Sequence, residues 1–388
     1  MAIAPELALD LFTDDAIRDP SPPYREIRDA GPAVWLAAHG VWALGRHEDV
    51  RAALRASDAL VSGHGVALND FLNSQPARAT LVSDGALHRR RRRALMGPMM
   101  PSALAAVRGE IERLADDVVA ELVARGSFDG ITDFARRLPV GIVARLVGLP
   151  EEGRERMLEW AAASFDVLGP MNARAEAAAP KLLEMIQYAA SVRAEKLRPE
   201  GWAARLFAAA EAGELDAEDV PGLLVDYIAP SLDTTILGTG SLLFLLGRHP
   251  EQYAKVRAQP ELIPAAVHEA LRCESPVRAF TRYVAAPYRV DDVEIPAGAR
   301  VLILYGSANR DERRYEDPER YDVTRDAADH LAFGHGVHRC AGGHLGQLEL
   351  ESLLAAVVRR VRHIEVGEPD VLMSNLLRGF PTLPASFR

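Results

Sequence analysis

The sequence predicts a mainly α protein with small β-sheets, an α+β fold. Apolar side chains recur every three to four residues along most of the chain, as they do on the buried face of a helix. Runs that alternate between apolar and polar residues, as half-buried strands do, are short. These strand-like runs cluster near the start of the chain and in its last third, so helices dominate the predicted fold.

The helical period recurs from residue 24 to residue 361, and each range below places apolar residues on one side of a helix. In chain order it predicts helices over 24–30, 47–55, 86–96, 101–125, 139–147, 151–165, 180–197, 219–246, 250–258, 260–272 and 343–361.

Strands are predicted where short runs are rich in branched and aromatic residues. These runs cover 34–36, 41–44, 281–285, 288–290 and 300–304. Ala38-His39-Gly40 separates the first two, and this spacing predicts a hairpin.

The composition is that of an ordinary globular protein. Of the 388 residues, 48% are hydrophobic and 26% are charged, and the formal net charge is −10. An acidic chain gives no global argument for nucleic-acid binding. No linker-like tract or repeat divides the chain, so we expect a single domain over residues 1–388.

The sequence also predicts a cytoplasmic protein. The first residues contain acids and prolines rather than a basic start followed by an apolar core, so we expect neither a signal peptide nor a membrane anchor. No run approaches about 20 uninterrupted apolar residues. Two cysteines without a disulfide pattern fit a reducing compartment.

The most informative segment is residues 333–342, Phe-Gly-His-Gly-Val-His-Arg-Cys-Ala-Gly. It places Cys340 in front of a predicted helix, where free backbone N–H groups and the helix dipole favour a thiolate. A lone cysteine is more often a small buried hydrophobe. Zinc is poorly supported because the only other cysteine, Cys273, is distant in the sequence.

This segment resembles the haem-binding signature of the cytochrome P-450 family, F-G-x-G-x-H-x-C-x-G, at every fixed position. The resemblance covers nearly the whole chain, since other signposts of the family follow in the expected order. It implies the cytochrome P-450 fold, with haem b between a long kinked helix and the helix after the cysteine loop. It also implies that Cys340 binds the iron, with Phe333, Gly334, Gly342 and Ala229 beside the cofactor.

Glu269 and Arg272 lie three residues apart and can meet on one helix face. An isolated pair of this kind is usually a surface ion pair. Pro318-Glu319-Arg320-Tyr321, however, looks like the family's P-E-R-F segment. The resemblance implies a buried structural network of Glu269, Arg272 and Arg320.

The predicted helix 219–246 contains Asp233-Thr234-Thr235, which matches the end of the family pattern A-G-x-D-T-T. The resemblance implies catalytic roles for both Thr234 and Asp233, which deliver protons during oxygen activation. A helix that merely tolerates threonines is the alternative. Pro230 and Ser231 replace the usual Ala-Gly, and we expect Pro230 to open or kink the helix there.

His88 and Arg92 begin and nearly end a run of basic residues, 88–93. They resemble the family's H-x-x-x-R and imply contacts to the haem propionates, as do His338 and Arg282. Outward-pointing arginines form a basic patch that could dock an acidic electron carrier, although simple solubility is an equal alternative for Arg89 and Arg90. His335 and His344 are expected to be exposed.

The substrate pocket is expected, from the resemblance, around residues 61–82 and 164–172. Expected contacts besides Ala229 are Val66, Leu68, Phe71, Phe165, Leu168 and Phe280. Apolar walls favour a small hydrophobic substrate. Residues 62–66 and 304–310 look like bacterial members that oxidise substituted aromatic compounds, including benzoates, and His64 or a loop serine could anchor a carboxylate.

The resemblance therefore implies a monooxygenase that hydroxylates or O-demethylates a small aromatic molecule. It implies no bound flavin, so electrons would come from a separate ferredoxin or flavodoxin and its reductase, and NAD(P)H would act only indirectly. No nucleic acid or membrane is expected as a partner. The alternatives are oxidation of a terpene, fatty acid or natural-product intermediate, a peroxide-driven enzyme, and a non-catalytic haem-thiolate binding protein.

Overall fold

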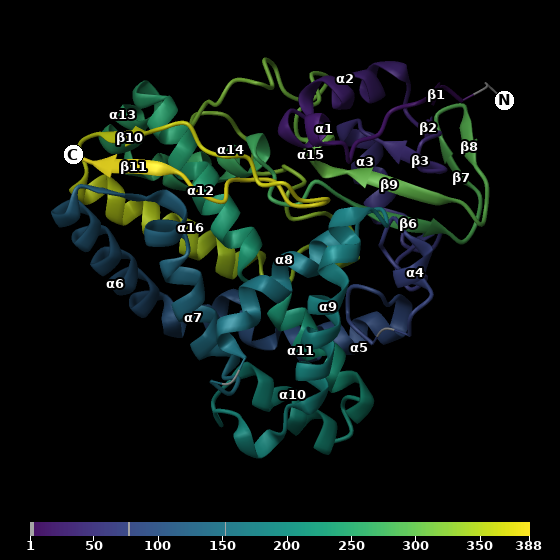
Figure 1. The fold of residues 1–388 in the computed structure, drawn as a ribbon, viewed down its shortest axis with the longest axis horizontal. Helices are drawn as coiled ribbons and strands as arrows, with labels where there is room; N and C mark the ends of the chain where they lie inside the picture. The colour runs from purple at the N-terminus through teal and green to yellow at the C-terminus, as the bar shows by residue number, and fades with distance from the viewer. Residues whose placement is uncertain (1–3, 77, 152) are drawn as a thin grey trace.

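The computed structural model describes residues 4–76, 78–151 and 153–388. Helices occupy most of the molecule, and a sheet near the N-terminus packs against them (Figure 1). The α-helices are α1 (Asp14–Arg18), α2 (Ser21–Ala30), α3 (His47–Arg55), α4 (Asp70–Asn73), α5 (Gly85–Met96), α6 (Pro101–Arg125), α7 (Arg137–Val147), α8 (Met157–Val167), α9 (Ala173–Ser191), α10 (Trp202–Glu211), α11 (Val220–Ile228), α12 (Asp233–Arg248), α13 (Pro250–Ala258), α14 (Ile263–Cys273), α15 (Tyr305–Ala308) and α16 (Gly343–Arg360).

The strands form three sheets. The largest has the order β1-β2-β3-β9-β6-β4, a second has the order β10-β11-β5, and β7 pairs with β8. Their bounds are β1 (Glu6–Leu7), β2 (Val34–Leu36), β3 (Val41–Leu44), β4 (Leu60–Val61), β5 (Ser127–Asp129), β6 (Ala279–Val284), β7 (Tyr288–Val290), β8 (Val293–Ile295), β9 (Arg300–Leu304), β10 (Ile364–Val366) and β11 (Pro384–Phe387).

The predicted fold class is confirmed, and several predicted bounds hold to the residue. They include the helices 47–55, 101–125 and 250–258 and the strands 34–36, 41–44, 288–290 and 300–304. The first hairpin turns as predicted: β2 and β3 are antiparallel, and Gly40 has φ +61°. A glycine suits that position because other residues rarely adopt positive φ.

Other predicted bounds were wrong. The helix expected over 180–197 is α9, which begins at Ala173 because the Asn172 side chain accepts a hydrogen bond from the Ala175 N–H and caps it. The helix expected from residue 151 begins at Met157. Helix α10 was not predicted. The β10-β11-β5 sheet was also not predicted, since its strands pair with segments that are distant in the sequence rather than across a short turn.

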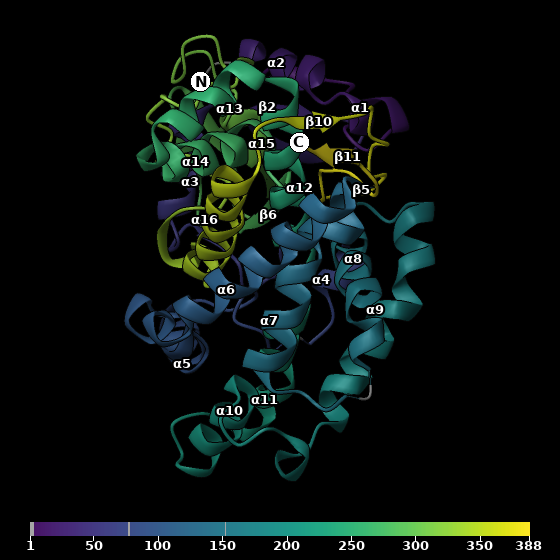
Figure 2. The same ribbon diagram turned by 90° about the vertical axis from the view of Figure 1, so that its left-hand side faces the viewer.

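The largest buried cluster joins α6, α7, α11, α12, α14 and α16. Helix α16 packs along α6, and Figure 2 shows the two side by side. Two further clusters lie against the six-stranded sheet. Helix α12 packs against both β10 and α16 (Figure 1).

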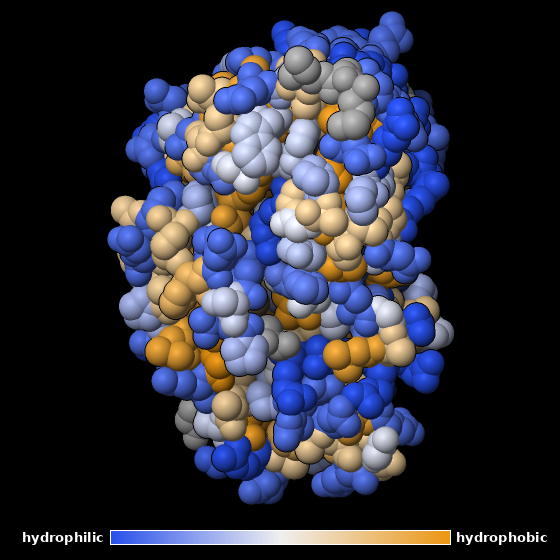
Figure 3. Space-filling model, turned by 90° about the vertical axis from the view of Figure 1, so that its right-hand side faces the viewer, coloured by the Kyte–Doolittle hydropathy of each residue, from blue (hydrophilic) through white to orange (hydrophobic). Residues whose placement is uncertain are grey.

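The segment Ala217–Arg248 is long and apolar enough to span a membrane by length and composition, with a mean hydropathy of 1.3. Within it, 61% of the most apolar window is buried inside the protein, as expected for a core helix. The surface in Figure 3 mixes hydrophilic residues with small hydrophobic patches and shows no continuous hydrophobic band.

The cysteine loop, residues 331–342, is held close to α3. Gly336 has φ +70°, and a Cβ built there would lie 2.3 Å from the Leu54 carbonyl oxygen. Gly334 has φ +65°, but a Cβ there would have its nearest neighbour at 3.9 Å. Both glycines relieve backbone strain, and only Gly336 also permits a close approach of two backbones.

We therefore expect Gly336→Ala to lower the free energy of unfolding by about 2–4 kcal/mol, since it combines strain at positive φ with a backbone clash. Gly334→Ala is the control and should cost about 1 kcal/mol, the strain alone. Urea unfolding of the purified proteins measures both. Equal losses would contradict the role of the Leu54 contact.

Candidate functional site

Cys340 ends the loop that precedes α16. Its backbone N–H donates to the Phe333 carbonyl at 2.7 Å, which folds the loop back on itself. The thiol lines an internal cavity of about 460 Å³. Cys340 keeps accessible surface, which faces this cavity, although it lies deep inside the protein. The surrounding protein raises the pKa of its thiol by desolvation, and the Gly342 N–H and the Arg92 guanidinium oppose that rise. The sequence-based expectation that the start of a helix would stabilise a thiolate here thus describes only one of two opposing effects.

Basic side chains gather around the cysteine side of the cavity. Arg92, Arg282 and His338 line it, and the ring of His88 lies 4.2 Å from that of His338. The Nε2 atoms of His88 and His338 are buried without a hydrogen-bond partner among the described residues. Burial lowers the pKa of His88 to about 4, and it also lowers that of His338. The His338 Nε2 atom also lies 3.8 Å from the Asp84 Oδ1 atom, beyond hydrogen-bond length. Nitrogens that lack a hydrogen bond and lie beside two arginines suit an acidic ligand with carboxylates, such as a haem with its propionates.

The arginines of the run 88–93 do not share one environment. Arg91 is buried and binds Asp219 at 2.7 Å, and Arg90 pairs with Asp216. Arg89 and Arg93 are exposed. Within this run, therefore, one arginine is buried, one forms a surface ion pair and two are exposed, so the run does not form one basic patch.

The long helix predicted over 219–246 is broken. Helix α11 ends at Ile228 and α12 begins at Asp233, so the opening expected at Pro230 is present. The Ser231 hydroxyl donates to the Tyr227 carbonyl, and the Thr234 hydroxyl donates to the Pro230 carbonyl at 2.9 Å. Both contacts satisfy carbonyls that the interrupted helix leaves free.

Asp233 and Thr234 lie at the break. Thr234 lines the cavity, whereas Asp233 lies beside it, and its Oδ2 atom is buried without a hydrogen-bond partner among the described residues. Burial raises the pKa of Asp233 to about 7. A carboxyl group with a pKa near neutral can both take up and release a proton at physiological pH. The geometry therefore suits proton transfer at Asp233 and hydrogen bonding at Thr234.

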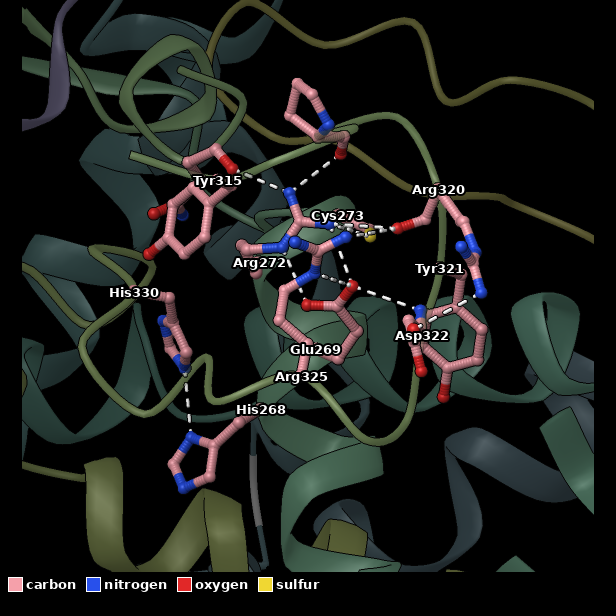
Figure 4. A network of polar contacts seen from close by, with 12 residues as sticks. His268, Glu269, Arg272, Cys273, Tyr315, Arg320, Tyr321, Asp322, Arg325 and His330 are labelled. Carbon is pink, nitrogen blue, oxygen red and sulfur yellow. Dashed lines mark hydrogen bonds and ion pairs between the residues drawn. The ribbon is translucent and has the colours of Figure 1, made fainter. Parts of the chain in front are cut away.

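Figure 4 shows the buried network around Glu269 and Arg272. Arg272 donates to the two carboxylate oxygens of Glu269 at 2.7 and 2.9 Å, and both side chains are fully buried. Arg272 also donates to the carbonyls of Asn309 and Pro318 at 2.8 Å. This pair fixes the segment that precedes the cysteine loop.

The third member expected, the Arg320 side chain, is absent from this network. It is 57% exposed and pairs with Asp322 at 3.4 Å, while only its carbonyl accepts from Arg272. Arg325 takes its place and donates from Nε to Glu269 at 2.9 Å. Sequence reasoning missed Arg325 because nothing local distinguishes two arginines five residues apart on an irregular segment.

The cavity wall away from Cys340 is mostly apolar. Val66, Phe165, Leu168, Phe280 and Ala229 line it as expected, and Phe333, Gly334 and Gly342 line its cysteine side.

Two expected wall residues are corrected. Phe71 is 59% exposed, because α4 turns it outward, and Leu68 packs into the core beside the sheet. His64 is also outside the cavity and stacks on Tyr283, with ring centroids 4.4 Å apart. His344 is exposed as expected, whereas His335 accepts a hydrogen bond from Arg55 at 2.9 Å.

Asp226 lines the same wall and was not singled out as a site residue. It sits in α11 within an apolar stretch, Leu-Val-Asp-Tyr-Ile, and that isolated carboxylate was the available signal. Its Oδ2 accepts from the Thr80 N–H at 2.6 Å. Burial raises its pKa to about 6.

Residues 164–387, more than half of the chain, match the family described as Cytochrome P450. Among curated proteins, Cytochrome p450 CYP199A2 of Rhodopseudomonas palustris is 36% identical, over 98% of this chain and 94% of its own. Beta-dihydromenaquinone-9 omega-hydroxylase of Mycobacterium tuberculosis is 30% identical, over 96% of this chain and 77% of its own. The crystal structure of an intact type IV self-sufficient cytochrome P450 monooxygenase superposes with a TM-score of 0.86 at 29% identity, covering 98% of this chain and 52% of the other.

The buried network generates a test of the two arginines. Arg325→Ala should lower the free energy of unfolding by about 1–3 kcal/mol, since it leaves a buried carboxylate one partner short. Arg320→Ala, the matched control, should change it by less than about 0.5 kcal/mol, because an exposed pair contributes little. Chemical unfolding measures both changes. A larger loss for the Arg320 variant would contradict this assignment.

Proposed function

The chain belongs to the cytochrome P450 family, whose members are haem b monooxygenases, and we propose that it hydroxylates or O-demethylates a small hydrophobic, aromatic substrate. The observation that carries the proposal is the internal cavity, which has the Cys340 thiol on one side and apolar walls on the other. Phe165 and Phe280 lie nearly parallel in the wall, 23° apart, with ring centroids separated by 6.4 Å. Aromatic walls of this kind favour planar aromatic ligands.

The side chains on the cysteine side fit the cofactor of the family. Cys340 would hold the iron through its thiolate, and His88, Arg92, Arg282 and His338 would bind the propionates. The propionate oxygens would give the two unpartnered histidine nitrogens the hydrogen bonds they lack. When bound, the haem supplies the activation of dioxygen and the insertion of one oxygen atom into a C–H bond.

The residues at the helix break would manage protons. Asp233, with a pKa of about 7, would pass a proton from the protein toward the cavity. The Thr234 hydroxyl would accept a hydrogen bond from the group that carries this proton, and so would keep the proton at the cavity wall. The hydroxyl is held in place because its Oγ1 donates to the Pro230 carbonyl across the break. The apolar wall would exclude other water, which keeps proton delivery confined to this route.

We also propose a cytoplasmic protein that receives electrons from a ferredoxin or flavodoxin and its reductase. Exposed arginines at the cysteine loop support this: Arg339 belongs to the loop, and Arg55 donates a hydrogen bond to His335 of the loop. A basic surface would attract an acidic carrier and would weaken at high salt.

Thr234→Ala should keep oxygen consumption but lower the product formed per NAD(P)H roughly 10-fold, since the hydroxyl that directs the proton is lost. Thr234→Ser, which keeps a hydroxyl, should lie near the wild-type value. Product yield and hydrogen peroxide release, measured with a ferredoxin couple, report the change. Unchanged coupling in the alanine variant would contradict the role of Thr234.

Titration of the ferric protein with neutral methoxy- and alkylbenzenes should shift the Soret band toward high spin, because a ligand in the cavity expels water from the iron. Terpenes and fatty acids of similar volume are the comparison. A shift with these and with none of the aromatics would refute the aromatic substrate while leaving the monooxygenase intact.

A further inference from the structure

The charges around the cavity are segregated. The basic residues that line it, Arg92, Arg282 and His338, gather at the cysteine side. Arg92 donates to the Arg339 carbonyl, next to Cys340, and Arg282 donates to the Thr281 carbonyl at 2.8 Å. Among the described lining residues, none of the cations belongs to the opposite wall, formed by α8, α9 and α11. A carboxylate on the substrate would therefore find no partner there.

The opposite wall carries an acid instead. Asp226 lies in α11, eight residues before Thr234 and on the other side of the break between α11 and α12. Although it lies deep inside the protein, the residue keeps accessible surface, which faces the cavity it lines. The second acid of the lining, Glu349, belongs to α16 on the cysteine side, and burial raises its pKa to about 8.

The contacts of Asp226 leave acceptor capacity unused. One hydrogen bond of ordinary length reaches it, from the Thr80 N–H to Oδ2. The Leu81 N–H and the charges of Arg91 and Arg92 also act on this carboxylate, from the neighbouring loop and from α5. An ionised carboxylate can accept about four. The simplest alternative is a structural role, in which Asp226 acts as a latch: its hydrogen bond from Thr80 fixes the loop against α11. A neutral side chain that accepts one hydrogen bond could fill that role.

Most other polar side chains of this wall are engaged by the protein; the exception is the Thr80 hydroxyl, which is buried without a hydrogen-bond partner among the described residues. Ser164 donates to the Ala161 carbonyl at 2.6 Å, Ser231 to the Tyr227 carbonyl, and Tyr227 to the Leu95 carbonyl at 2.9 Å. Asn73 exchanges hydrogen bonds with the Ala67 backbone. Asp226 is thus the group on this wall with the most capacity to orient a substrate.

We propose that Asp226 is a specificity-determining residue that binds a protonated amine on the substrate. This inference rests on the proposed function and narrows its substrate class from aromatic molecules in general to those that carry an ammonium group. An ammonium anchored at Asp226 directs the opposite end of the molecule toward Cys340. The charge-assisted hydrogen bond compensates for the burial of both ions.

Three probes of matched shape test the proposal on the ferric haem protein. They are 4-methoxybenzyl(dimethyl)amine, its neutral isostere 4-isobutylanisole, and 4-methoxyphenylacetate. Dissociation constants come from the Soret shift at pH 7.5. We expect the amine to bind at least about 10-fold more tightly than the neutral isostere, and the carboxylate to bind most weakly. A carboxylate that binds as tightly as the amine overturns the proposal.

The variant Asp226→Asn removes the charge and keeps an oxygen for the Thr80 N–H. It should abolish the roughly 10-fold preference for the amine and leave the affinity for the neutral isostere unchanged. Asp216→Asn, which removes a surface acid paired with Arg90, is the control and should leave all three affinities unchanged. A preference that survives in Asp226→Asn means that Asp226 is only a latch. Should that variant fail to bind haem, the ranking in the wild-type protein still decides.

The same comparison on a straight-chain scaffold separates the two proposals. Dodecyl(dimethyl)amine, dodecanoate and dodecane serve if no aromatic probe binds, which would refute the aromatic substrate alone. An amine preference that Asp226→Asn removes on this scaffold would still support the acid anchor. No spectral shift from an amine on either scaffold would overturn it.

Discussion

The position of Cys340 depends on the buried pair of Arg272 and Glu269. Arg272 uses one part of its guanidinium to bind Glu269 and the rest to bind the carbonyls of Asn309, Pro318 and Arg320. The Asn309 side chain in turn accepts from the Leu331 N–H at 2.7 Å, at the start of the cysteine loop. A fully buried ion pair gains little net stability by itself, because desolvation offsets the attraction. Its value here lies in fixing several irregular segments with one rigid, planar group.

The break between α11 and α12 lies on the other side of the same cavity. A proline inside an apolar helix removes one backbone hydrogen bond and pushes the preceding turn aside. The Ser231 and Thr234 hydroxyls take up carbonyls at the break, so the opening is stabilised rather than merely tolerated. The free-energy cost of the break is the desolvation of Asp233, whose buried Oδ2 atom lacks a hydrogen-bond partner among the described residues. Such a cost is common where a site needs a group with a perturbed pKa.

The sequence predicted the parts of the site that depend on local spacing. The cysteine loop, the i,i+3 pair of Glu269 and Arg272, and the opening at Pro230 all follow from residues close together in the chain. The partners that distant segments supply could not be predicted. Arg325 rather than Arg320 reaches Glu269, α4 turns Phe71 outward, and His64 finds Tyr283 instead of the cavity. Each outcome depends on how irregular segments pack, and hydrophobic periodicity carries no information about them.

The charge segregation in the cavity also depends on which segments meet. The basic residues come from α5, β6 and the cysteine loop, and they face the side where the cofactor's propionates would neutralise them. The acid comes from α11, where it accepts a hydrogen bond from the Thr80 N–H. With the cofactor's carboxylates in place, the cations are compensated and the charge of Asp226 is not. If Asp226 anchors a positive substrate as proposed, carboxylates bound to Arg92, Arg282 and His338 would weaken the competition from these cations for the charge of Asp226.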